Sequence, residues 1–152
     1  MFGTRKGQGA TEYLVLLAVV LIIALVSIAL LGFFPGLAGD ARKTQSDSYW
    51  RGEARPFQIL EHSCNSATLT LVVQNSESDK RILNTTKFDG DGTLANVTTF
   101  AGGETKTLSI TNVTCGTAGT SYEFTNVTFT YNTPKLNGQT QIGSKPLLGK
   151  AV

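Results

Sequence analysis

The side chains that most often do chemistry are few in this chain. Its 152 residues include one histidine, His62, and two cysteines, Cys64 and Cys115. His62 follows Glu61, and such a pair can transfer protons, but general acid–base catalysis also needs a partner at the reacting atom. Neither a second histidine nor a nucleophile motif accompanies the pair. We therefore interpret His62 as a surface or strand-end residue, and we predict that the protein is not an enzyme and needs no cofactor.

The two cysteines predict a disulfide rather than a metal site. Their separation does not match the ligand spacing of zinc sites, whereas a Cys64–Cys115 bridge would close a loop of about 50 residues and stabilise the fold by about 4 kcal/mol. Two buried thiols are the alternative. The segment Asp89–Gly92 has part of the pattern of a calcium-binding loop, but it lacks the glycine and the final glutamate of an EF-hand. We interpret it as a hairpin turn and predict no metal site.

Asparagine side chains offer a third kind of chemistry, covalent modification. Four of them stand in the Asn-x-Ser/Thr pattern that accepts N-linked glycans. These candidates are Asn84, Asn96, Asn112 and Asn126. A polar strand face is the alternative reading of each.

All of these residues follow a long apolar segment, which decides on which side of a membrane they would lie. Positions Tyr13–Gly39 carry no charged side chain, and 20 of the 22 residues from Tyr13 to Phe34 are hydrophobic. As a helix, 22 residues span about 33 Å, enough to cross a hydrocarbon core of about 30 Å. Arg5 and Lys6 precede the segment, so the positive-inside tendency places residues 1–7 in the cytoplasm and the polar half outside.

Three interpretations of the apolar segment compete. It could be a permanent membrane anchor, or a secretory signal peptide cut near the small residues of 36–38. Signal peptides, however, have apolar regions of about 7–15 residues, much shorter than this one. The third interpretation depends on Glu12, because a carboxylate at the edge of a membrane helix is costly and a simple anchor does not need it.

The residues around Glu12 resemble the class III signal peptide of archaeal type IV pilins. That pattern has a basic residue and glycine, then glutamine, a serine two positions later, a glutamate after two more, and a leucine four positions beyond the glutamate. Here Lys6-Gly7 is followed by Gln8, Glu12 and Leu16 in register. Ala10 occupies the serine position, which is a departure from the pattern.

The resemblance implies how the chain is processed and used. A prepilin peptidase would cut between Gly7 and Gln8, so that residues 1–7 form a leader. Residues 8–50 would form a hydrophobic helix that spans the membrane first and later packs in the core of a helical homopolymer. Glu12 would pair with the new amine of Gln8 and register each subunit as the pilus machinery adds it. The family implies an extracellular, often glycosylated filament that adheres to a surface or cell ligand.

Composition narrows the other possible functions. Thirteen basic and 11 acidic residues form no basic excess, so we predict no binding to nucleic acid. Removal of residues 1–7 would leave equal numbers of basic and acidic side chains, which suits a subunit that packs against copies of itself. The alternative function is a membrane-anchored or secreted β-domain that binds a ligand and does not polymerise.

Beyond the apolar segment, the sequence predicts an α+β protein. Pro35 should kink the helix, which we expect to continue to about residue 50. From residue 55 to 152, period-two alternation and turn residues predict an immunoglobulin-like β-sandwich. The expected strands cover 57–61, 68–74, 81–88, 96–100, 106–111, 122–132 and 139–142. In the segment 122–132 the parity of apolar residues slips, and we predict a β-bulge near Thr125-Asn126.

Overall fold

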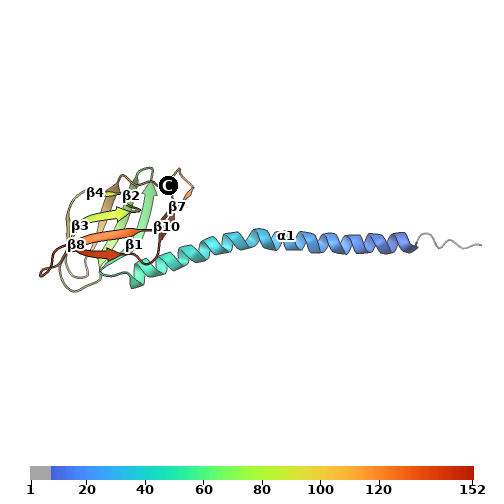
Figure 1. Cartoon of the computed structure of the whole chain (residues 1–152), viewed down its shortest axis with the longest axis horizontal. Coiled ribbons are helices and arrows are strands. Elements are labelled where there is room, and N and C mark those ends of the chain that lie inside the picture. The colour runs from blue at the N-terminus through green and yellow to red at the C-terminus, as the bar shows by residue number, and fades with distance from the viewer. Residues whose placement is uncertain (1–7) are drawn as a thin grey trace, which may run out of the picture. The chain divides into compact units, whose positions relative to one another are not determined.

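The computed structural model describes residues 8–152, and for residues 8 and 33–37 it describes only the backbone. A single long helix precedes a set of antiparallel strands, which confirms the predicted α+β layout (Figure 1). The chain divides into two compact units, with the boundary between Ala41 and Arg42. The sequence placed the start of the β-domain at residue 55, whereas the second unit, here called the β-unit, begins at Arg42.

Helix α1 extends over Gln8–Ser48, and a π-helical turn, η1 (Tyr49–Glu53), follows it. Pro35 does not end the helix, because a proline costs one backbone hydrogen bond while the residues on both sides favour helix. The kink expected at Pro35 stays a prediction. The backbone leaves the helical region at Ala54, whose N–H donates to the carbonyl of Tyr49 at 2.9 Å.

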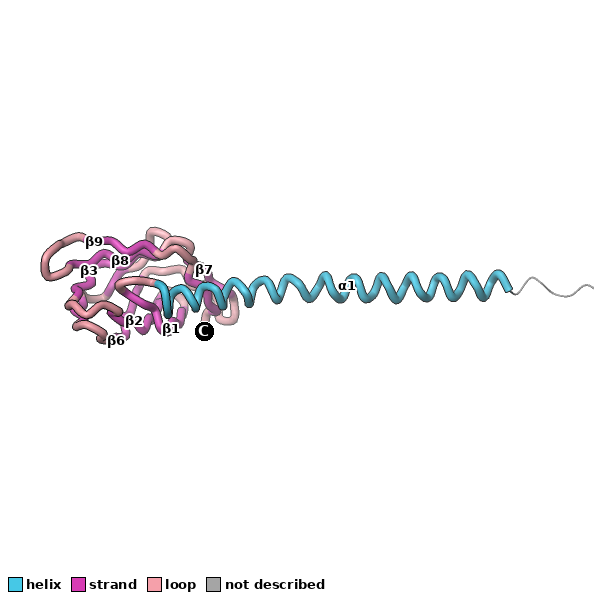
Figure 2. The backbone as a smooth tube through the Cα atoms, turned by 90° about the horizontal axis from the view of Figure 1, so that it is seen from below, coloured by secondary structure: helices cyan, strands magenta, loops and turns pink. Residues whose placement is uncertain are grey.

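Most strands of the β-unit form two four-stranded antiparallel sheets. One sheet has the order β1-β2-β6-β4, with bounds Phe57–Asn65, Thr68–Asn75, Thr105–Thr111 and Thr93–Leu94. The other has the order β5-β3-β8-β9, with bounds Thr98–Phe100, Arg81–Phe88, Val127–Asn132 and Gln139–Ile142. Figure 2 shows β3, β8 and β9 as a layer apart from β1, β2 and β6. Apart from the short β5, these strands stand in the A-B-E-D and C-F-G order of an immunoglobulin-type sandwich.

The inner faces of the two sheets share one hydrophobic core. Along β2, Leu69, Leu71 and Val73 are fully buried while the residues between them are at least partly exposed, as period-two alternation predicts. Phe129 of β8 contacts both Phe57 and Phe88, with ring centroids 5.9 and 6.3 Å apart. Such aromatic pairs stabilise a core beyond the area that they bury.

The predicted single strand over 122–132 is wrong. The chain forms two strands there, β7 (Ser121–Phe124) and β8, and they belong to different sheets. β7 pairs with β10 (Leu147–Lys150), while β8 pairs with β3 and β9. The apolar residues of β7 and those of β8 both reach the core. They do so because the chain passes from one sheet to another between the two strands, and not through the predicted bulge.

Hydrogen bonds to Asp89 hold the two residues, Thr125 and Asn126, that separate β7 from β8. The Asp89 carboxylate accepts hydrogen bonds from the Thr125 hydroxyl at 2.7 Å and from the backbone N–H of Asn126 at 2.7 Å. Asp89 itself stands in the hairpin turn predicted for Asp89–Gly92, where it and Gly90 both have positive φ, 53° and 94°. Two successive positive φ values are typical of a type I′ hairpin turn. The predicted turn is confirmed. The Asp89 carboxylate binds the chain between β7 and β8 and so has a structural role.

The last helical residues, from Arg42 onward, belong to the β-unit and pack against its strands. Trp50 is 1% exposed and its ring lies edge-on to Phe129, with centroids 6.3 Å apart. A Cβ at Gly143 would lie 2.4 Å from the Trp50 ring, so only glycine fits beside it. The Ser46 hydroxyl donates to the carbonyl of Pro146 at 2.7 Å. These contacts are the reason why the compact unit begins before the first strand.

Candidate functional site

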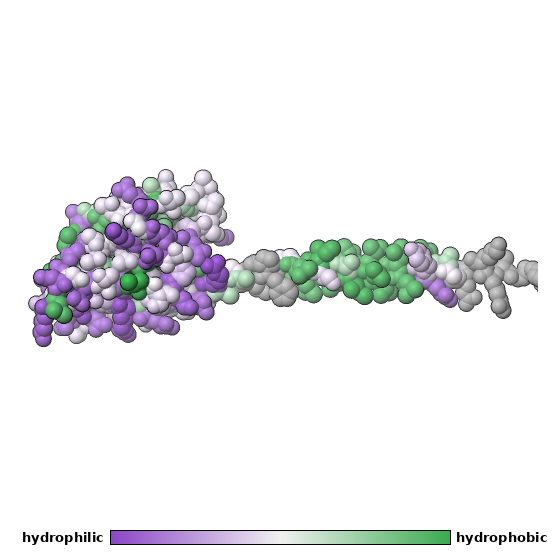
Figure 3. All heavy atoms as spheres, viewed as in Figure 1, coloured by the Kyte–Doolittle hydropathy of each residue, from purple (hydrophilic) through white to green (hydrophobic). Residues whose placement is uncertain are grey.

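The apolar part of α1 presents its side chains without cover in the first unit. Within the segment Gly9–Gly32, a window of 18 residues has a mean hydropathy of 3.4, and none of that window is buried. The large apolar side chains of the segment are between 43% and 69% exposed, around the whole helix. Figure 3 shows them as a nearly continuous hydrophobic surface on the side in view. By length and composition, this helix could cross a membrane, or it could serve as a signal sequence.

This segment has few polar side chains. Ser27 satisfies its hydroxyl within the helix, and Glu12 lies near the helix start. The Ser27 hydroxyl donates to the carbonyl of Ile23 at 2.7 Å, so it needs no partner outside the helix. Glu12 is exposed in the second turn of α1, four residues after the helix begins at Gln8. Residues at i and i+4 share a helix face, so the carboxylate of Glu12 lies on the same face as the start of the helix. The predicted cleavage position, Gly7, lies outside the described residues.

The predicted disulfide is present between Cys64 and Cys115, which are 51 positions apart. Cys64 lies near the end of β1 and Cys115 in the segment after β6, and both residues are buried. The bridge therefore joins β1 to the chain beyond β6. It also stands beside the C-terminal segment, since the carbonyl of Cys64 accepts the N–H of Val152 at 2.9 Å.

The four glycosylation candidates differ in exposure. Asn96, Asn112 and Asn126 are exposed, and each lies in a turn or loop. Asn84 is half-buried within β3, and the hydroxyl-bearing residue of its motif, Thr86, is 2% exposed. Because a modifying enzyme must reach both residues of the motif, the first three are better placed to carry glycans on the folded protein.

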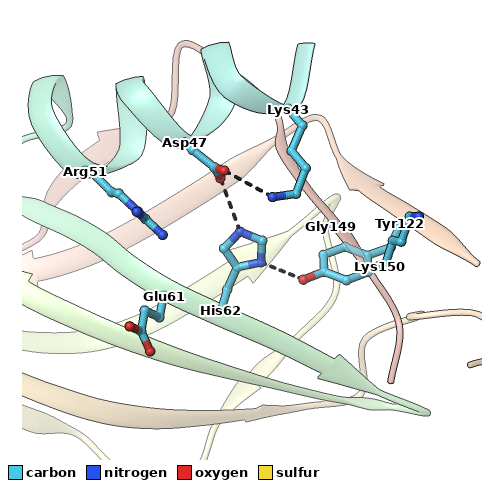
Figure 4. A pocket seen from close by; sticks show the side chains of 8 residues that line it. All are labelled: Lys43, Asp47, Arg51, Glu61, His62, Tyr122, Gly149 and Lys150. Carbon is cyan, nitrogen blue, oxygen red and sulfur yellow. Dashed lines mark hydrogen bonds and ion pairs between the residues drawn. The ribbon is translucent and has the colours of Figure 1, made fainter. Parts of the chain in front are cut away.

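A polar cluster surrounds His62, which the sequence predicted to be a surface or strand-end residue. His62 lies inside β1, its side chain is 12% exposed, and it contacts residues from two other elements (Figure 4). Its Nδ1 is 2.6 Å from the hydroxyl of Tyr122, and its Nε2 is 3.8 Å from Oδ1 of Asp47. Asp47 also accepts a hydrogen bond from Lys43 at 3.2 Å. The prediction of a surface or strand-end histidine is wrong, because the end of α1 covers this side of β1.

Burial controls the protonation of this cluster. Desolvation lowers the pKa of His62 below 6.5, although the neighbouring carboxylate of Asp47 acts in the opposite direction. Desolvation likewise raises the pKa of Tyr122 to about 12, with a smaller contribution from Asp47. Neutral His62 accepts a hydrogen bond from the Tyr122 hydroxyl when its own proton is on Nε2. The geometry connects the helix end to β1 and β7, which is a structural role.

The pocket at this cluster has a volume of about 350 Å³ and both signs of charge on its walls. Its other charged side chains are Lys43, Arg51, Glu61 and Lys150. Glu61, the sequence neighbour of His62, points away from His62 in Figure 4. Asp47 and Tyr122 are far from His62 in sequence, and no motif links the three residues. Sequence reasoning therefore had no signal with which to find the cluster.

We expect His62 to make the β-unit less stable as the pH falls. Since the folded pKa lies below that of the unfolded chain, the unfolded state binds the proton more tightly. The stability contribution is therefore present above about pH 6.5 and is lost as the pH falls toward the folded pKa. Urea unfolding of the detergent-solubilised chain between pH 7.5 and 5 measures this loss, and His62→Gln should reduce it. An equal pH dependence in the unmodified protein and in His62→Gln would contradict the assignment. Asp47→Asn should make the loss larger, because the Asp47 carboxylate raises the pKa of His62.

Metal-binding geometry is not apparent in the part of the chain that the structure describes. Within residues 8–152, no three histidine, cysteine, aspartate or glutamate side chains form a group that could hold an ion. Comparison with known proteins finds no family model that matches this chain and no match among curated proteins.

Proposed function

We propose that this chain is a pilin, the structural subunit of an extracellular filament of the archaeal type IV kind. The observation that carries the proposal is an uncovered apolar helix with Glu12 near its start, directly after the Lys6-Gly7-Gln8 flank. An apolar surface of this extent does not stay in water, so either lipid or other apolar helices must cover it. A pilin uses both coverings, first lipid and then copies of itself.

The β-unit supports the extracellular half of this proposal. Disulfides persist in oxidising surroundings and are rare in the cytosol, so the Cys64–Cys115 bridge agrees with a β-domain outside the cell. The basic flank before the helix agrees with a cytoplasmic leader. Polar strand faces and glycans on the exposed asparagines would coat the filament. Adhesion to a surface or cell ligand is the role that we propose for this coat.

Assembly needs a specific contact because the hydrophobic effect alone does not favour it. Lipid tails are as apolar as leucine, so moving the helix from the membrane into a filament core gains little from burial. Close packing of helices and the pairing of polar groups must supply the difference. Glu12 provides such a group, and a free amine at Gln8, created by cleavage, would be its partner in a neighbouring subunit. The contact is heterologous, and in the filament that we propose its rotation does not close into a ring, so the contact propagates as a helix.

The mature N-terminus of the exported protein tests the proposal directly. We expect peptide mapping of the native protein to find a chain that begins at Gln8, with linked Cys64 and Cys115 peptides and glycans on one or more of Asn96, Asn112 and Asn126. A chain that begins at Met1 would indicate a fixed anchor. A start near Gly39 would indicate a secreted domain. Either of these results would favour the alternative function, a β-domain that binds a ligand without polymerising.

A further inference from the structure

We propose that the β-unit binds a sugar carboxylate in a pocket between β3 and the loop that joins β8 to β9. The pocket has a volume of about 390 Å³, within the range of about 300–1,000 Å³ that small-molecule sites occupy. Its lining comprises Asp79, Arg81, Tyr131, Thr133, Pro134, Lys135, Leu136 and Gln139. The inference goes beyond polymerisation and concerns the β-unit alone, so it stands whether or not the chain assembles.

Arg81 is the residue that points to a ligand. Its guanidinium carbon lies over the ring of Tyr131, 5.7 Å from the centroid, which holds the group in place. Its Nε is buried, and within residues 8–152 it has no hydrogen-bond partner. A buried donor without an acceptor is costly, and native structures leave few of them. Because solvent does not reach Nε, a ligand in the pocket would pair with the two terminal nitrogens of the Arg81 guanidinium, which have no carboxylate within 4.0 Å among the described residues.

Two other arginines of the β-unit have acidic partners, whereas Arg51, like Arg81, has no carboxylate within 4.0 Å among the described residues. Arg42 pairs with Glu123, and Arg55 lies 4.0 Å from Glu77. Among the described residues, no carboxylate lies within 4.0 Å of Arg81, even though Asp79 lines the same pocket. The forked guanidinium is therefore available for a carboxylate, whose two oxygens match its geometry.

The loop opposite Arg81 is rigid enough to form a wall. The Thr133 hydroxyl accepts the N–H of Leu136 at 2.9 Å, and the N–H of Thr133 donates to the carbonyl of Leu136 at 2.7 Å. The side chain of Asn132 accepts the N–H of Gly138 at 2.8 Å and closes the other end of the loop. Local hydrogen bonds of this kind order a loop before a ligand arrives, which lowers the entropic cost of binding.

The remaining side chains favour a sugar over a simple carboxylate. Leu136 is 60% exposed, and together with Pro134 it offers an apolar surface for the C–H face of a sugar ring. Asp79 and Gln139 line the same pocket. The Asp79 carboxylate can accept hydrogen bonds from sugar hydroxyls, and the Gln139 amide can both donate and accept them. Lys135 adds a second positive charge. A hexuronate carries all of the matching groups.

Titration of the full chain in detergent micelles with sodium glucuronate tests this proposal. We expect saturable shifts in the amide NMR signals of residues 131–139, with a Kd on the order of 1 mM for a ligand of about 13 non-hydrogen atoms. Glucose lacks the carboxylate and acetate lacks the ring, so each should bind at least about tenfold more weakly. Arg81→Gln should lower the affinity for glucuronate at least about tenfold, and Arg81→Lys should lower it less.

Arg55→Gln is the matched control, because it removes an exposed arginine that already has an acidic neighbour, and it should leave binding unchanged. Equal thermal unfolding of the variants shows that they are folded. Unsaturable shifts, unchanged affinity in Arg81→Gln, or acetate binding as tight as glucuronate would each overturn the proposal. So would shifts at these amides that follow protein concentration and not glucuronate, since these would assign the pocket to a second copy of the chain.

Discussion

Replacing Glu12 by glutamine should stop filament formation while export and cleavage continue. Glutamine keeps the size and the hydrogen-bonding atoms of the side chain but removes its charge, so the amine at Gln8 would lose its ionic partner. Breaking a buried pair by removing one member costs about 3–5 kcal/mol, because the other charge stays uncompensated. We therefore expect the ratio of polymerised to membrane-held, processed subunit to fall at least about tenfold, and Glu12→Ala should behave in the same way.

Ser27→Ala is the matched control on the same helix. The Ser27 hydroxyl is already bonded to the carbonyl of Ile23, so its loss should leave filament yield unchanged. Normal filaments from both Glu12 variants would show that Glu12 only favours the start of the helix through its dipole. Loss of cleavage would instead assign Glu12 to recognition by the peptidase.

Removing the disulfide should destabilise the β-unit by about 4 kcal/mol. The bridge joins cysteines 51 positions apart, and opening it returns the corresponding chain entropy to the unfolded state. For a unit of this size, such a loss lowers the melting temperature by roughly 15–20 °C. Calorimetry of the double variant Cys64→Ala, Cys115→Ala against the oxidised protein measures the difference.

Reduction of the unmodified protein separates the bond from the packing around it. Reduction keeps both sulfur atoms in their buried positions, so a similar loss in the reduced protein would assign the effect to the cross-link. A loss in the double variant alone would assign it to the cavity that alanine leaves. Equal stability of all three forms would contradict the prediction.

The sequence by itself determined those features that depend on neighbouring residues. The apolar segment is visible because membrane-length helices need an unbroken run of apolar side chains. The turn at Asp89-Gly90 is visible because few residue pairs adopt positive φ twice in succession. The Cys64–Cys115 bridge followed from there being two cysteines in one polar domain, and the alternation in β2 followed from the two-residue period of a strand.

Only the tertiary structure decided which distant segments meet. The sequence predicted one strand over 122–132, because apolar alternation does not reveal that β7 and β8 pair with different partners. The short β10 was missed because its place depends on pairing with β7, which lies more than twenty residues earlier.

Both polar sites were also invisible in the sequence. His62 acquired its environment from the end of α1 and from β7, and Arg81 acquired its position from the ring of Tyr131. A local pattern records what one segment favours, whereas a site forms from side chains that come together only when the chain folds.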